Sequence, residues 1–402
     1  MSSSFSDRLR NLASPGKQGS DIKQFSNSES WRPRMEIGED GGVVVSTPRP
    51  IGQTNSEIEI LSEFDLNSDD WDICSARKSK WQSHDGSWLE AYRITIRPRD
   101  SVYMQDKADF EKLVDEISRW KPKKTSEKIT GDLAYVFAPS DQQIGKKANG
   151  EGTEHSISRI LKGTSGGVER LQELRKIGRK IGTVVIALPG DHVEGNVSQG
   201  GKLQSSYASD LGLTEQTRVA RRLLISQVKA FAEVAERVVV IVVNGNHDEV
   251  TRQVIADPAD GWNVEIASSV QDACAENSNL SHVEFRYPDS GHQTLSVSIC
   301  GTTIGLFHGH QSGKDVTKYL SGQAAGQTAL GMADIWISGH FHHFKIMDIG
   351  NRLWIQAPTT DPGSEWFRDR HGLDSPPGVL SLVIGNGYDP RKDISIISTT
   401  LD

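Results

Sequence analysis

The spacing of apolar and polar positions changes along the chain and predicts where strands and helices lie. From about residue 132, short apolar runs rich in β-branched residues alternate with longer amphipathic stretches, a pattern typical of a parallel sheet with crossover helices. Strands are predicted at 133–137, 183–188 and 237–243. A helix capped by Thr214 is predicted over 214–236. Farther along, a helix is expected around 314–328, and antiparallel strands are expected at 283–287, 293–299 and 302–307. The last predicted strands are 334–338, 345–349, 352–356 and 379–384.

The part of the chain before residue 126 has a different pattern. Residues 1–30 are rich in Ser, Asn and Gly and are expected to form a disordered tail. Residues 31–125 are predicted to form a small α+β accessory domain and its linker, and 126–402 a larger α/β domain. Within the accessory region we predict strands at 42–45 and 89–96 and a helix at 56–63. A second helix is predicted at 106–121, followed by a linker at 122–128.

Composition narrows the class of protein only a little. The 402 residues suggest two or three domains, and the net charge of −8 excludes a generally basic nucleic-acid coat but not a local basic groove. No apolar run approaches the roughly 20 residues that span a bilayer, and the N-terminus lacks the apolar core of a signal peptide. We therefore expect a cytoplasmic protein without a membrane partner. Cys74, Cys274 and Cys300 form no CxxC pair and are expected to be reduced.

Polar residues that can bind a metal follow five of the predicted strands. These residues are Asp141 and Gln143, Asp191, Asn246 and His247, His308, and His340 and His342. Because open α/β sheets bind ligands at the carboxyl ends of their strands, we expect these side chains to meet. Five of the twelve histidines fall between His308 and His343, where even spacing would place about one. Imidazole and carboxylate together suit Zn, Fe, Mn or Ni, and the lack of cysteine ligands argues against a structural zinc site.

The order of these motifs resembles the calcineurin-like metallophosphoesterase superfamily. That family carries D-x-H, G-D, G-N-H-[DE], H and G-H-x-H, each at a strand end. This chain has Asp141-Gln-Gln143, Gly190-Asp191, Gly245-Asn-His-Asp248, His308 and Gly339-His-Phe-His342, so four of five blocks match in order. The resemblance covers about 130–360 and implies a four-layer α/β/β/α sandwich. Asp248 is also open to a simpler interpretation, as the cap of a helix starting there.

The resemblance also implies roles for individual residues. Asp191 would bridge two divalent ions, with Mn favoured over Mg, Zn or Fe. Asp141, Gln143 and His342 would complete the shell of the first ion. Asn246, His308 and His340 would complete that of the second. His247 would act near the leaving-group oxygen, oriented by Glu194. His310 and His343 are expected to surround the ligands or lie on the surface.

Gln143 departs from the family pattern, which has His at this position. Its carbonyl oxygen is a harder and weaker ligand than imidazole, which favours Mn²⁺ or Mg²⁺ over Zn²⁺ or leaves the first ion loosely held. His155 is an alternative donor for that ion. A degenerate metal site in a non-catalytic binding module is a further alternative.

Several features favour a nucleic acid as the substrate. Residues 144–153, 190–196 and 213–220 resemble metallophosphoesterases of actinobacterial tailed phages, which are nuclease-like, of the repair exonuclease type. We therefore expect a DNA exo- or endonuclease, in the host cytoplasm if it is phage-encoded. In the accessory domain Trp81 could stack on bases beside several cations, although core packing is the alternative. Arg368 could contact phosphate or lie in a solvated loop. A cyclic-nucleotide phosphodiesterase and a phosphomonoesterase are the other enzymes to consider, and the oligomeric state stays open.

Overall fold

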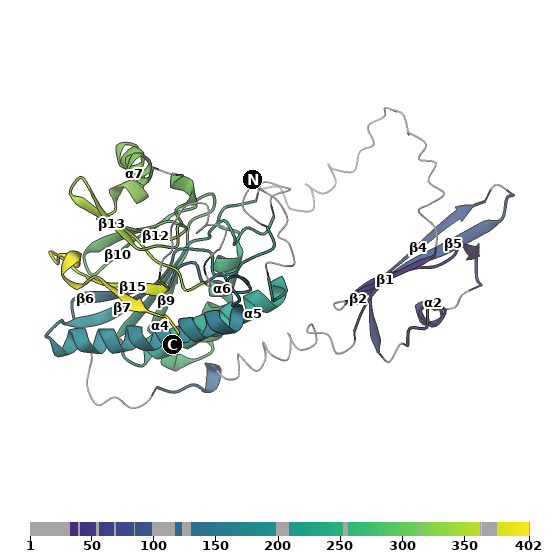
Figure 1. The fold of residues 1–402 in the computed structure, drawn as a ribbon, viewed down its shortest axis with the longest axis horizontal. Helices are drawn as coiled ribbons and strands as arrows, with labels where there is room; N and C mark the ends of the chain where they lie inside the picture. Colours follow the sequence, from purple (N-terminus) through teal and green to yellow (C-terminus); the bar gives the residue numbers. More distant parts are fainter. Residues whose placement is uncertain are drawn as a thin grey trace, which may run out of the picture. The chain divides into compact units, whose positions relative to one another are not determined.

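The computed structural model divides the chain into two compact units, residues 1–107 and 108–402. It describes residues 33–38, 41–53, 56–67, 70–83, 85–98, 117–122, 130–197, 209–251, 256–313, 315–361, 363 and 376–401. The predicted tail at 1–30, most of the predicted helix at 106–121 and most of the linker lie outside these residues. Both units are drawn in Figure 1.

The first unit is an antiparallel sheet with one short helix. Its sheet has the order β1-β2-β5-β3, and β4 pairs with the other edge of β5. The strands are β1 (Arg34–Gly38), β2 (Gly41–Val45), β3 (Arg49–Pro50), β4 (Trp71–Gln82) and β5 (Trp88–Pro98). Helix α2 (Glu57–Ser62) covers one face of the sheet through Ile60 and Leu61, which pack with Val44 and Ile94. Strands β2 and β5 and helix α2 lie where the pattern predicts them, whereas no bounds were predicted for strands β1, β3 and β4.

The larger unit is built on a six-stranded sheet whose four central strands are buried on both faces and whose edge strands are partly exposed. Its order is β16-β15-β6-β7-β8-β9. The strands β6 (Leu133–Ala138), β7 (Ile181–Leu188) and β8 (Arg237–Val242) are parallel, and the outer strands are β9 (Val283–Arg286), β15 (Gly378–Ile384) and β16 (Ser395–Ser398). Tyr135 and Phe137 face a core shared with helices α4 (Thr153–Lys176), α5 (Leu213–Ala232) and α6 (Trp262–Ala275). Ala134, Val136 and Ala138 face the opposite way, as period-two alternation requires. Among the described residues, no helix has the length and apolarity needed to cross a membrane.

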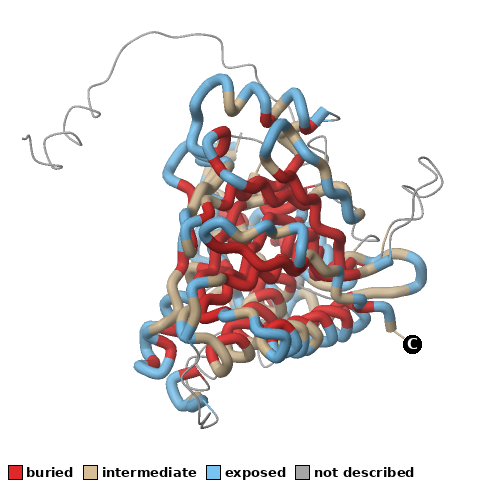
Figure 2. Tube along the Cα trace, turned by 90° about the vertical axis from the view of Figure 1, so that its left-hand side faces the viewer, coloured by how far each residue is buried: buried red, intermediate tan, exposed pale blue. Residues whose placement is uncertain are grey.

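A second sheet of five strands packs on the side of the first sheet away from α4, α5 and α6. Its order is β10-β11-β12-β14-β13, formed by β10 (Leu295–Ile299), β11 (Thr302–Leu306), β12 (Ile335–Ser338), β13 (Lys345–Ile349) and β14 (Arg352–Gln356). Ile304 and Ile337 contribute to the core between the sheets. Helix α7 (Val316–Ala325) packs through Leu320 against Trp336 and Trp354 on the outer face. Figures 1 and 2 show these layers and the buried band through their middle.

Three sequence predictions about this unit were wrong. Strand β9 (Val283–Arg286) was expected to be antiparallel but pairs in parallel with β8, because α6 returns the chain to the starting end of the sheet. Helix α5 is capped by the Gly212 backbone, whose N–H donates to Glu215 Oε2 at 2.9 Å, and not by Thr214. No helix starts at Asp248, since α6 begins at Trp262. Strand β16 (Ser395–Ser398), which follows β15 (Gly378–Ile384), was not predicted.

Candidate metal centre

The loops after β6, β7 and β8 meet because the three strands run in parallel and end at one edge. The N–H of Asp141 donates to Gly190 O at 3.2 Å, and that of Gln143 to Asp191 O at 2.9 Å. The loops after β11 and β12 join in the same way, since the N–H of Gly339 donates to His308 O at 2.8 Å. Parallel pairing aligns the loops within each sheet, and the packing of the two sheets brings all five loops to one place.

The Nε2 atom of His308 is surrounded by side-chain atoms of Asp191, Asn246 and His340. His308 Nε2 lies 2.9 Å from Asp191 Oδ2, 3.1 Å from Asn246 Oδ1 and 3.2 Å from His340 Nδ1. One ligand atom each from Asp191, His308 and His340 falls within 4.8 Å of the others. His308 and Asp191 are fully buried, and His340 is partly exposed. The structure thus brings together the four residues expected to hold the second ion.

The contacts of His308 require a positive charge at its Nε2 atom, supplied either by a proton or by a metal ion. His308 Nδ1 lies 2.8 Å from the carbonyl oxygen of Pro189, which can only accept, so Nδ1 must carry a proton. A neutral His308 then presents an Nε2 lone pair to Asp191 Oδ2 and Asn246 Oδ1, which are themselves acceptors. A backbone carbonyl that orients the outer nitrogen is also the usual support of a metal-bound histidine. The donor set therefore fits a divalent metal ion.

The residues expected to hold the first ion lie in a different network. His342 Nε2 is 3.4 Å from Asp141 Oδ1, while His342 Nδ1 is 3.2 Å from Asp361 Oδ2. Asp361 Oδ2 also forms a short ion pair with Lys146 Nζ. The same ammonium donates to Gln143 Oε1 at 2.7 Å, so the oxygen predicted to bind metal already accepts a hydrogen bond from a cation.

Backbone strain is concentrated at this centre. Of the nine described non-glycine residues with positive φ, five belong to the predicted ligand set: Asp141, Gln143, Asp191, His340 and His342. Such conformations cost of order 1–3 kcal/mol each and persist at sites where the surrounding structure imposes them. Close approach explains two of the motif glycines. A Cβ on Gly245 would lie 2.1 Å from Asp191 Oδ1, and one on Gly339 would lie 2.3 Å from Asp141 Oδ2.

His247 is attached to the centre through both its backbone and its ring. Its N–H donates to Asp191 Oδ1 at 2.8 Å, and its Nδ1 donates to Glu194 O at 2.9 Å. The carboxylate of Glu194 lies 3.5 Å from the same Nδ1. This geometry assigns the proton of neutral His247 to Nδ1 and leaves Nε2 as the nitrogen available for chemistry.

Asp248 connects two of the loops. Its Oδ2 accepts the N–H of Asp191 at 2.7 Å and that of Gly245 at 2.8 Å, so one buried carboxylate holds the loops after β7 and β8 together. Burial and the nearby charge of Asp191 raise the pKa of Asp248 to about 7. The sequence placed this residue in the Gly-Asn-His-Asp motif and left a helix cap as the simpler interpretation, and the structure replaces that cap with a clamp between loops.

The histidines of the centre have pKa values displaced in opposite directions. Burial lowers the pKa of His308, but the attraction of the Asp191 carboxylate outweighs it and raises the pKa to about 9. Burial likewise lowers the pKa of His342, which Asp361 and Asp141 raise to about 10. Burial and the neighbouring His308 lower the pKa of His340 to about 3. Without a metal, protons on His308 and His342 offset the charge of the buried carboxylates.

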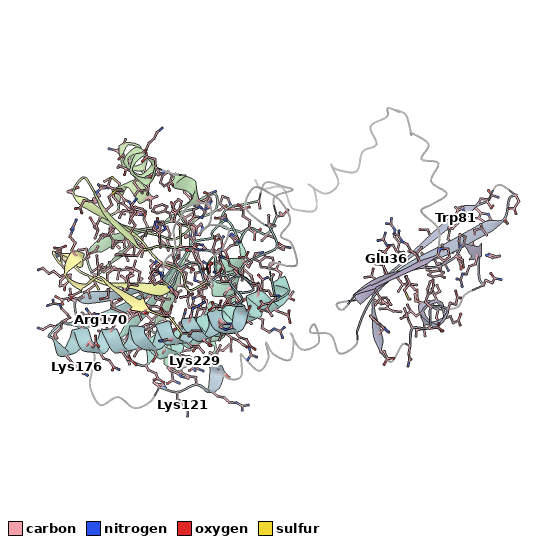
Figure 3. The ribbon with its side chains drawn as sticks, viewed as in Figure 1. Glu36, Trp81, Lys121, Arg170, Lys176 and Lys229 are labelled. Carbon is pink, nitrogen blue, oxygen red and sulfur yellow. The ribbon has the colours of Figure 1, made fainter. Side chains whose placement is uncertain are left out.

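The other residues singled out from the sequence lie around or away from the centre. The rings of His310 and His308 have centroids 5.4 Å apart, and His343 Nδ1 donates to Phe341 O at 2.7 Å. His155 is exposed on the first turn of α4, and no contact with Gln143 is found among the described residues. Trp81 lies on β4 of the first unit (Figure 3). Arg368 lies outside the described residues.

Sequence reasoning missed Lys146 and Asp361 as members of the centre. Lys146 stood in a segment singled out only for its sub-family resemblance, and Asp361 followed no predicted ligand motif. A weak signal was available, because Asp361 lies just beyond the end of β14, a parallel neighbour of β12 in the second sheet. Strand-end carboxylates in that sheet reach the same edge as His308 and His340.

Comparison with known proteins adds little beyond these contacts. No family model matches the chain, and no curated protein matches it. Similar solved structures include an archaeal phosphodiesterase, with 15% identity over 65% of this chain and 99% of that one, at a TM-score of 0.30. A predicted phosphoesterase from Streptococcus pneumoniae shows 15% identity over 63% and 83% of the chains, at 0.27. Vps29 complexed with Zn from Entamoeba histolytica shows 18% over 63% and 87%, also at 0.27. Sequence identities and TM-scores this low support no inference about activity, so the functional assignment rests on the site.

Proposed function

We propose that this protein is a metal-dependent phosphodiester hydrolase. The observation that carries the proposal is the convergence of Asp191, Asn246 and His340 on the Nε2 atom of His308, with His247 attached to the same Asp191 carboxylate. A divalent ion bound there would lower the pKa of a water molecule and neutralise phosphoryl oxygens. The number and identity of the ions stay predictions, with two ions and Mn²⁺ expected from the motif pattern.

His247 is the residue that would handle the proton of the leaving group. Its Nδ1–H is held by the Glu194 carbonyl, so Nε2 is free to carry a proton toward an alkoxide leaving group when the ring is charged. The carboxyl group of the buried Glu194 lies 3.5 Å from the same Nδ1. The backbone bond from His247 to Asp191 Oδ1 fixes the ring relative to the metal ligands. The assignment of His247 and Glu194 as the catalytic pair therefore has a geometric basis.

We propose a nucleic acid, most simply DNA, as the substrate. On the sheet of the first unit, Arg77 of β4 lies directly opposite Arg93 of β5, and both side chains are exposed. Trp81 is four residues farther along β4 and therefore on the same face. Two like charges placed opposite each other destabilise a sheet unless an anion offsets them. A phosphate backbone between the arginines, with a base against Trp81, would supply that anion.

A substrate panel tests both the proposed diesterase activity and the proposed nucleic-acid substrate. With Mn²⁺ present, we expect hydrolysis of bis-nitrophenyl phosphate and of DNA and little hydrolysis of a nitrophenyl monoester. Cleavage of cyclic nucleotides but not DNA would keep the diesterase and reject the nucleic-acid substrate. Strong monoesterase activity without diesterase activity would reject the proposal itself.

A non-catalytic binding module is the second candidate function. It is favoured by one observation, the hydrogen bond from Lys146 to Gln143, which occupies the oxygen of a predicted ligand. In that case the protein would retain no metal after purification in Mn²⁺ and would cleave none of the esters. Metal content measured by mass spectrometry alongside the substrate panel separates the two candidates.

A further inference from the structure

The ammonium group of Lys146 lies among the residues predicted to hold the first ion. Its Nζ donates to Gln143 Oε1 at 2.7 Å and forms a short ion pair with Asp361 Oδ2. Asp361 Oδ2 in turn lies 3.2 Å from His342 Nδ1. The side chain of Lys146 is 14% exposed and that of Asp361 is fully buried, so this cation is held in place by the fold.

A divalent ion and this ammonium would compete for the same oxygen. An ion bound to Gln143 Oε1 at a normal metal–oxygen distance would lie within roughly 5 Å of Lys146 Nζ, because the ammonium is 2.7 Å from that oxygen. Like charges this close repel strongly in a buried site. Gln143 is also a neutral and weak ligand, so it offers little to offset the repulsion. The Lys146 ammonium and an ion at Gln143 are therefore poorly compatible.

The other two residues expected to bind the first ion, Asp141 and His342, already have partners within the protein. Both carboxylate oxygens of Asp141 accept the N–H of His340, at 3.1 and 3.0 Å, and Oδ2 also accepts the Ser140 hydroxyl. His342 lies between Asp141 and Asp361, with one ring nitrogen facing each carboxylate. Lys146 and Asp361 then cancel each other's charge.

We propose that the Lys146 ammonium takes the place of the first divalent ion, so that the centre binds one ion, held by Asp191, Asn246, His308 and His340. This inference rests on the proposed metal-dependent function and changes the two-ion expectation drawn from the motif pattern. Lys146 supplies a permanent positive charge beside the bound ion, and Gln143 and Asp361 position that charge. The substitution of Gln for the usual His is thereby explained, because an amide oxygen accepts a hydrogen bond from an ammonium.

Metal stoichiometry of the full chain tests the proposal directly. The protein is stripped with a chelator, equilibrated with Mn²⁺, freed of excess ion and measured by mass spectrometry. We expect about one Mn²⁺ per chain, with the electron paramagnetic resonance spectrum of an isolated ion. Two ions per chain with an exchange-coupled spectrum would overturn the inference while supporting the proposed function. Absence of any bound ion would contradict both.

Variants show whether the ammonium is what excludes the other ion. In the double variant Gln143→His/Lys146→Ala we expect the content to rise from about one to about two Mn²⁺ per chain, with exchange coupling. Gln143→His alone should stay at about one, because the ammonium remains. A rise to two in Gln143→His alone, or no rise in a folded double variant, would overturn the proposal.

Two further variants serve as controls. Lys146→Arg keeps a cation and should keep one ion, which also covers the case in which Lys146→Ala does not fold. Lys147→Ala removes the exposed neighbouring lysine and should match the unaltered protein in both content and spectrum. If Lys146→Arg bound a second ion, as is expected for the double variant, the positive charge at position 146 would not be what excludes that ion. This result would contradict the proposal.

Discussion

The backbone N–H of His247 donates to Asp191 Oδ1 at 2.8 Å, which joins the predicted general acid to the predicted central metal ligand. The two residues lie on different loops, 56 positions apart in sequence. Their side chains have separate tasks, since Asp191 faces His308 whereas the His247 ring is held by Glu194. The two roles can therefore be separated by substitution.

His247→Ala should leave metal content unchanged and lower turnover by roughly 10²–10⁴-fold, the usual contribution of general acid–base catalysis. The backbone bond to Asp191 survives this change, so the ligands stay in place. Asp191→Ala should instead lose bound metal. Metal analysis and diester hydrolysis measured on the same samples check both, and equal metal loss in the two variants would show that the roles are wrongly assigned.

Gly245→Ala should disturb the centre although it removes no ligand. The new Cβ would lie 2.1 Å from Asp191 Oδ1, so either the loop or the carboxylate must move. We expect a stability loss of about 1–3 kcal/mol by urea denaturation, together with reduced metal content. Gly322→Ala in helix α7 is the matched control, because its Cβ meets nothing within 4 Å and it should be neutral or slightly stabilising. Normal metal content in Gly245→Ala would mean that metal binding does not need the close approach of Gly245 to Asp191.

Asp248→Ala should destabilise the larger unit, because it leaves the N–H groups of Asp191 and Gly245 buried without an acceptor. Two such groups cost about 2–4 kcal/mol together. Asp248→Asn keeps an acceptor oxygen and should lose clearly less. Urea denaturation distinguishes the three proteins, with the exposed Asp260→Ala as the surface control. If Asn and Ala at position 248 were equally destabilising, the charge of Asp248 and not its acceptor would matter.

Asp393 should contribute stability that depends on pH. Burial raises its pKa, but hydrogen bonds from Arg179 and Tyr388 outweigh burial and lower the pKa below its ordinary value. A carboxyl group with a lowered folded-state pKa stabilises the fold above its unfolded pKa, near 4, and loses that contribution as pH falls further. Asp393→Asn should therefore be less stable than the unaltered protein at pH 7, and the gap should narrow below about pH 4. Denaturation curves across this range check the sign, and a gap that widens in acid would refute it.

Much of the site could be predicted from the sequence, because each expected ligand follows an apolar strand. Asp191 follows the β-branched run of β7, and His308 follows that of β11, and parallel strands end at a common edge. The direction of β9 was not readable, since a four-residue strand carries the same alternation whether it pairs in parallel or antiparallel. The bounds of the twelve-residue strand β4 could not be predicted, because its polar, cation-rich run lacks a clear alternation.

The sequence by itself determined the residue types at the strand ends and the glycines that let those ends approach one another. Only the tertiary structure decided what the side chains meet. Lys146 and Asp361 are 215 positions apart, and no local pattern links them. They meet because the two sheets pack face to face and bring the loop after β14 beside the loop after β6. A local pattern reports the shape of a segment, whereas partners from different sheets are set by how the sheets pack.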